Sequence, residues 1–120
     1  MTDTTLNISP ADIETLEQLY RLRSRSEVLE FINKYPFLLP VLLEAPEKIR
    51  QYFPDSQLFL EVDTDAEIPD WVHLVLSILM NLEPDEAVDR LHELDKDWFR
   101  GLPYQVHQQF FTTLEYPDEF

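Results

Sequence analysis

The sequence predicts an α+β fold: a small antiparallel three-stranded sheet packed with helices, in the chain order helices, strand, strand, helix, strand. The longest apolar run, Trp71–Leu82, has an apolar residue at every even position, which is typical of a strand with one fully buried face. Two further segments, Gln57–Asp63 and Gln108–Tyr116, alternate apolar and polar residues as strands do. The remaining segments show helical spacing and begin at prolines or capping residues.

The central run also admits a helical interpretation, because His73, Ser77 and Asn81 are four residues apart and would form a narrow polar stripe. We favour the strand, since the run is short and is bounded by Pro69 and Pro84. The run is also too short and too interrupted to span a membrane.

The N-terminal part of the chain is expected to be helical. Residues 1–8 are polar, and we expect them to be disordered. Ser9 then has the position of a helix cap, with Pro10 at the first helical position, and the apolar spacing continues to about Arg23.

Two more helices are predicted before the first strand. Ser24 has capping-box spacing with Glu27, which indicates a second helix that ends at Tyr35. Pro36 begins a third helical pattern. Pro46 lies inside this pattern, and we expect it to kink or split the helix after the preceding residue.

The C-terminal half is predicted to hold the sheet. The first strand and the central run form an antiparallel hairpin across the acidic connector Thr64–Asp70. Pro84 starts a helix that Gly101 stops, the third strand follows, and residues 117–120 are a tail. If the helix returns the chain across the sheet, the third strand lies beside the first, antiparallel to it, giving the spatial order second, first, third. Residues 9–116 are therefore expected to form one domain.

Charge is the strongest compositional signal. The chain has 24 acidic and 9 basic side chains, a net charge of −15, and no Lys or Arg between residues 51 and 89. Such a field repels phosphate backbones, so it disfavours direct nucleic-acid binding, and it attracts basic partners. The alternative is that the acids only keep the protein soluble. The absence of cysteine fits a reducing compartment, and the start of the chain does not resemble a secretory signal, so we expect a cytoplasmic protein.

Three strings carry a resemblance to a known family. They are YFPDSQLFLEV at Tyr52–Val62, LEPDEA at Leu82–Ala87 and LDKDWF at Leu94–Phe99. Together with the order of the elements over residues 30–116, they resemble a family of short acidic bacterial proteins with no assigned function. The resemblance therefore implies no active residues.

The sequence offers little support for an enzyme, and it indicates no catalytic residue, cofactor or metal. A single glycine cannot build a phosphate-binding loop, and cysteine is absent as a nucleophile. His73, His92 and His107 lie on three different predicted elements without ligand-type spacing.

The loop between the first two strands imitates a calcium loop at its first positions, Asp63, Asp65 and Glu67. The match ends there, because Ile68 occupies the position that needs glycine and Leu74 the position of the bidentate glutamate. The alternatives are an adventitious divalent cation at these carboxylates and a solvated acidic loop that can face a basic partner, and we favour the solvated loop.

Two surfaces are candidates for partner binding. The odd-numbered face of the sheet would form an apolar patch if helices cover only the other face; its residues are Phe59, Trp71, Val75, Leu79 and Phe111. The alternative is that helices cover both faces. The second surface joins the acidic loop, Asp63, Asp65 and Glu67, to the outer face of the helix that begins at Pro84, with Asp85, Glu86, Asp89 and Glu93. The alternative is that these acids are an ordinary solvent-facing surface.

These observations lead to three hypotheses about function. The first is a non-enzymatic protein-interaction module, either a homodimer or bound to another, basic protein. The second is an inhibitor, an antitoxin-like protein or a DNA mimic, which would block a basic nuclease or DNA-binding protein. The third, a metal-dependent hydrolase, lacks any recognisable constellation of residues.

Overall fold

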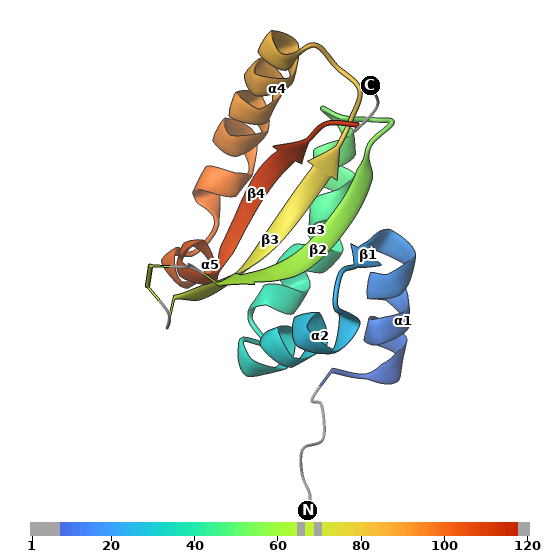
Figure 1. Cartoon of the computed structure of the whole chain (residues 1–120), viewed down its shortest axis with the longest axis vertical. Coiled ribbons are helices and arrows are strands. Elements are labelled where there is room, and N and C mark those ends of the chain that lie inside the picture. The colour runs from blue at the N-terminus through green and yellow to red at the C-terminus, as the bar shows by residue number, and fades with distance from the viewer. Residues whose placement is uncertain (1–7, 65–66, 69–70, 118–120) are drawn as a thin grey trace, which may run out of the picture.

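The computed structural model describes residues 8–64, 67–68 and 71–117 (Figure 1). The first half of the chain is mainly helical and consists of α1 (Pro10–Leu19), the short strand β1 (Arg21–Leu22), α2 (Arg25–Lys34) and α3 (Leu38–Arg50). The second half contains β2 (Gln57–Thr64), β3 (Val72–Leu79), α4 (Pro84–Asp97), the 3₁₀ turn η1 (Phe99–Gly101), α5 (Tyr104–Gln109) and β4 (Phe110–Glu115). The predicted α+β class is confirmed.

The predicted sheet is wrong in its strand count and its order. The sheet is mixed and four-stranded, with the spatial order β1-β2-β3-β4. The hairpin is present, because β2 and β3 pair antiparallel from Gln57 opposite Leu79 to Thr64 opposite Val72. The last strand, however, runs parallel to β3 on its far side, while β1 pairs parallel with β2 and occupies the edge that the prediction assigned to the last strand.

Strand β3 is central, as the apolar run predicts. Leu74, Leu76 and Ile78 are fully buried, and Met80 beyond the strand is 5% exposed. They face the helices and join the core that α1, α2, α3 and α4 contribute. Strands β2 and β3 are both paired on two sides, but β2 meets only the two-residue strand β1 along its outer edge, and β3 is the more buried of the two.

The N-terminal segment differs from the prediction at two points. Helix α1 begins as expected, since the Ser9 side chain accepts a hydrogen bond from the Asp12 N–H at 3.1 Å, but it ends at Leu19 and the chain then forms β1. The predicted capping box is absent, because Ser24 adopts a left-handed conformation (φ 59°) with no side-chain cap. The tight turn between β1 and α2 requires this conformation. Residues 1–7 and 118–120 lie outside the described residues, whereas Ile8 is buried in the core.

Helix α3 runs continuously through Pro46, so the predicted split does not occur. Proline has no N–H to donate to the carbonyl four residues earlier, which here belongs to Leu42. The hydroxyl of the buried Tyr20 donates to this same Leu42 oxygen at 2.6 Å. A residue just beyond α1 thus supplies the hydrogen bond that the proline removes.

The helices lie on one side of the sheet. In Figure 1 α3 lies behind β2 and β3, and no described helix crosses the face toward the viewer. Helix α4 belongs to the same layer, because Trp98 at its end donates to Glu44 of α3 at 3.0 Å and Arg90 donates to the Tyr52 carbonyl at 2.8 Å. The alternative in which helices cover both faces is therefore wrong for the described part of the chain.

Candidate interaction surface

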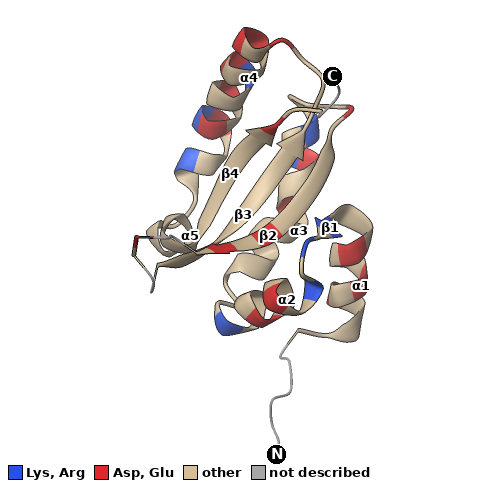
Figure 2. Cartoon of the chain, in the orientation of Figure 1, with Lys and Arg blue, Asp and Glu red and all other residues tan. Residues whose placement is uncertain are grey.

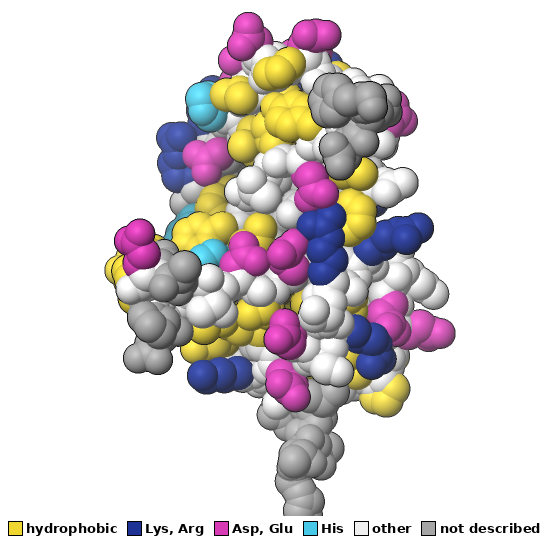
Figure 3. Space-filling view, in the orientation of Figure 1, with side chains coloured by type: hydrophobic (Ala, Val, Ile, Leu, Met, Phe, Trp, Pro, Cys, Tyr) yellow, Lys and Arg dark blue, Asp and Glu magenta, His cyan; other side chains and the backbone are white. Residues whose placement is uncertain are grey.

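The uncovered side of the sheet, which we call the open face, presents alternate residues of three strands (Figure 3). Directly paired residues share a face, so the register defines its members. They are Gln57, Phe59, Glu61 and Asp63 of β2, His73, Val75, Ser77 and Leu79 of β3, and Phe111, Thr113 and Glu115 of β4.

Arg23, from the turn after β1, lies at the centre of the open face. Its guanidinium contacts Glu115 and Glu61, each at 2.8 Å, and lies 4.1 Å from the centre of the Phe59 ring. Its backbone N–H donates to the Leu60 carbonyl at 2.8 Å, which fixes the start of the side chain at the sheet edge. Ser77 of β3 is only 4% exposed, and its side chain forms a hydrogen bond with Glu115 that also lowers the pKa of this carboxyl.

The contacts of Arg23 with Glu61 and Glu115, which we call the bridge, shift the pKa values of Arg23 and Glu115. The hydrogen bonds that Arg23 donates to the Glu115 and Glu61 carboxylates hold the pKa of its guanidinium above its usual value. Conversely, the hydrogen bond from Arg23 lowers the pKa of Glu115, although partial burial acts in the opposite direction. Arg23 is therefore fully committed to carboxylates of its own chain.

Asp63 has no such compensation. Burial raises its pKa above the usual value, and the neighbouring Glu61 carboxylate raises it further, while His73 lowers it only in part. The His73 ring packs between Trp71, with centroids 5.9 Å apart, and Phe111, with centroids 4.8 Å apart. Its Nδ1 atom is buried without a hydrogen-bond partner among the described residues.

The five residues predicted to form an apolar patch do not form a continuous one. Val75 is 8% exposed, Phe59, Leu79 and Phe111 are half-buried, and Trp71 is 45% exposed at the end of the sheet. The bridge from Arg23 separates Phe59 and Leu79 from Phe111. The open face is therefore mixed, with apolar side chains around a charged centre.

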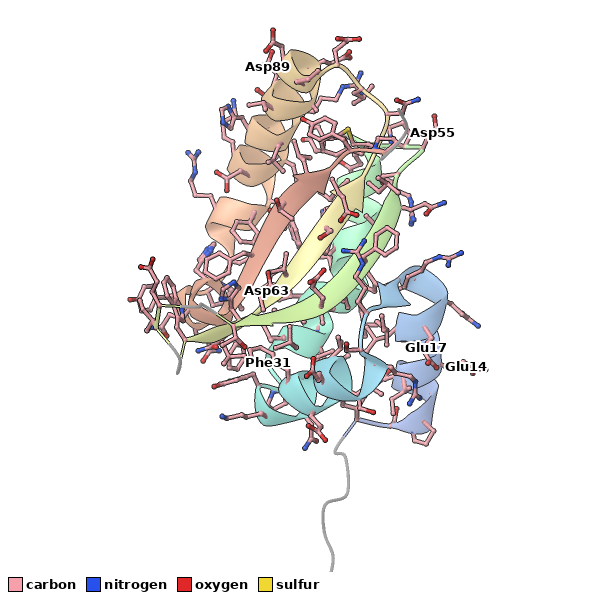
Figure 4. All side chains as sticks on the ribbon, in the orientation of Figure 1. Glu14, Glu17, Phe31, Asp55, Asp63 and Asp89 are labelled. Carbon is pink, nitrogen blue, oxygen red and sulfur yellow. The ribbon has the colours of Figure 1, made fainter. Side chains whose placement is uncertain are left out.

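The predicted acidic surface is dispersed (Figure 2). Asp63 belongs to the open face, Glu67 is exposed, and Asp65 lies outside the described residues. On α4, Glu86 pairs with Arg90 at 2.6 Å and Glu93 with Lys96 at 3.8 Å, whereas the exposed Asp85 and Asp89 form no ion pair within the described ranges. Figure 4 places Asp89 on α4 and Asp63 near the opposite end of the sheet, so loop and helix do not form one surface.

A further concave feature, which no sequence pattern predicts, lies at the end of the sheet where β3 begins; we call it the end groove. It has a volume of about 530 Å³ and lies between the end of α2, the start of β3 and the junction of α5 with β4. Its main lining residues are Phe31, Lys34, Tyr35, Trp71, His107 and Phe111. Because three segments contribute, no local sequence pattern could have predicted it.

The three histidines have different surroundings. His73 lies on the open face, His107 packs edge-on against Phe99 at 4.8 Å, and His92 is exposed on α4. Within the described ranges, no group of three or more His, Asp or Glu side chains is placed to hold a metal ion. No described helix is long and apolar enough to cross a membrane.

Comparison with protein-family models, with curated proteins and with solved structures gave no match. The resemblance to the family of short acidic bacterial proteins thus stays a prediction. The function is therefore inferred from the residues of this chain alone.

Proposed function

We propose that this protein is a non-enzymatic interaction module that binds a basic partner protein through the open face. The observation that carries the proposal is a sheet face without helical cover, on which half-buried apolar side chains surround carboxylates. Interfaces commonly combine such apolar contacts with a polar, hydrogen-bonded component.

The charge balance of the open face argues for a basic partner. Glu61, Asp63 and Glu115 supply three carboxylates, and Arg23 is the cation that contacts two of them. Asp63 remains next to Glu61 in a partly buried position, which is why its pKa is raised. A Lys or Arg side chain of a partner would relieve this repulsion and form a charge-assisted hydrogen bond.

The same balance argues against a homodimer through this face. Two copies placed face to face would bring like carboxylates together, and each copy carries a net charge of −15. A different, basic protein fits better. The lack of cysteine leads us to place this encounter in the cytoplasm.

The test compares two substitutions that add the same charge at two surfaces. Leu79→Lys alters the open face, and Val88→Lys alters the outer side of α4, where Val88 is 41% exposed. Each variant and the wild type are immobilised and incubated with an extract of the source cells, and retained proteins are quantified by mass spectrometry at low and high salt.

We expect one basic protein to be retained by the wild type and by Val88→Lys, to be lost with Leu79→Lys, and to be released by salt. Retention of the same basic protein by the wild type and by both variants would exclude the open face as the binding surface.

The inhibitor or DNA-mimic hypothesis is favoured by a different observation: Asp85 and Asp89 at the start of α4 are exposed and form no ion pair with any residue that the structure describes. It predicts loss of the partner with Val88→Lys but not with Leu79→Lys, together with competition by duplex DNA. The dispersed arrangement of the acids makes it our second candidate.

A further inference from the structure

The end groove combines aromatic walls with a positive charge. Phe31 and Tyr35, whose ring centroids are 4.8 Å apart, line it from α2, while Trp71 and Phe111 line it from the sheet. Trp71 is 45% exposed, although burial of an indole is favourable. The volume of about 530 Å³ lies within the range of small-molecule sites.

The electrostatics of the groove differ from those of the chain as a whole. One residue in five is acidic, yet no described carboxylate lines the groove. Lys34 lines it and forms no ion pair within the described ranges; its ammonium lies 5.5 Å from the centre of the Tyr35 ring. His107 is a second nitrogen-bearing side chain in the lining.

We propose that the end groove binds a small aromatic carboxylate. The ring of the ligand would contact Tyr35 and Trp71, and its carboxylate would contact the Lys34 ammonium, which has no competing anion among the described residues. This site adjoins the partner surface proposed above and shares Phe111 with it, but Lys34, Tyr35 and Trp71 lie outside the open face as defined above.

Charge complementarity makes the proposal selective. A net charge of −15 attracts cations to most of the surface, so non-specific association favours an aromatic amine over an aromatic acid. Only a local excess of positive charge reverses this preference, and Lys34 supplies it. The preference between two such ligands is therefore diagnostic of the groove.

The experiment uses two probes that share an indole ring and an ethylene linker, indole-3-propionate and tryptamine. Each is titrated into the ¹⁵N-labelled full chain, and the indole N–H signals of Trp71 and Trp98 are followed by NMR. Trp71 lines the groove, whereas Trp98 is 9% exposed and hydrogen-bonded to Glu44, so it serves as an internal control.

We expect indole-3-propionate to shift the Trp71 signal and to bind about tenfold more tightly than tryptamine, the ratio that one charge-assisted contact supplies. Lys34→Met should abolish this preference. Lys48→Met is the matched control, because Lys48 lies on α3 outside the groove lining and also forms no ion pair within the described ranges.

Three results would overturn the proposal: equal or tighter binding of tryptamine, no shift of Trp71 with about 10 mM indole-3-propionate, or equal effects of the two lysine substitutions. None of these results bears on the open face, which is tested by Leu79→Lys. The two proposals can therefore fail independently.

Discussion

The hydrogen bond between Tyr20 and Leu42 makes a specific prediction about the stability of the fold. Tyr20 is 3% exposed, and its hydroxyl donates to the Leu42 carbonyl inside α3 at 2.6 Å. The residue that would normally donate to this carbonyl is Pro46, which has no N–H. Tyr20→Phe therefore leaves a buried backbone acceptor without a partner.

The expected cost follows from this geometry. An unsatisfied buried acceptor lowers the free energy of unfolding by about 1 to 3 kcal/mol. For a chain of this length each kcal/mol lowers the melting temperature by roughly 4 °C. Urea denaturation followed by circular dichroism measures the loss. Tyr104→Phe is the matched control, since Tyr104 is 76% exposed and its loss of a hydroxyl should be neutral.

A double-mutant cycle isolates the proposed cause. Pro46→Ala restores an N–H that can donate to Leu42 within the helix. In the Pro46→Ala background, the loss of the Tyr20 hydroxyl should therefore cost about 1 kcal/mol less than in the wild type. Equal costs in the two backgrounds would refute the idea that the tyrosine compensates for the proline.

Further predictions concern ionisation and the charged bridge. Burial raises the pKa of Tyr20, so its hydroxyl stays protonated in the folded state at pH values where the unfolded chain ionises. The free energy of unfolding should therefore fall as the pH rises above about 10. Tyr20→Phe should flatten this fall, which urea denaturation at alkaline pH measures. The raised pKa of Asp63 means that the folded state binds a proton at this carboxylate more tightly than the unfolded state does, so this group should add stability, seen as a gain in melting temperature, as the pH falls through its folded-state pKa toward about 3.9. Asp63→Asn should reduce that gain, and an unchanged gain would contradict the assignment. Arg23→Met should lower the free energy of unfolding by about 1 kcal/mol, because Glu61 and Glu115 lose their shared cation; this figure is discounted for the partial exposure of the three side chains. The loss should shrink at high salt. A loss that does not depend on salt would instead indicate that Arg23 stabilises the fold by packing on Phe59.

Local sequence patterns were sufficient for much of the secondary structure. Alternation from Val72 to Leu82 predicts β3 and its buried face, because side chains on a strand point to opposite sides with a period of two. Pro10 and Pro84 mark the starts of α1 and α4, since proline suits the first helical turn. The antiparallel hairpin of β2 and β3, predicted across the long acidic connector Thr64–Asp70, is confirmed.

Long-range contacts decided what the sequence could not. The edge of β2 is taken by the two-residue strand β1, which is too short to produce a period, so β4 pairs with β3 instead. Pro46 does not interrupt α3, because Tyr20 satisfies the carbonyl that a local rule leaves unpaired. The same holds for the candidate sites. The bridge on the open face joins Arg23, Glu61 and Glu115, and the end groove joins side chains of α2, β3 and the α5–β4 junction. A sequence determines which faces of its elements are apolar, but only the packing of elements distant in the chain decides which faces are covered and which charges meet.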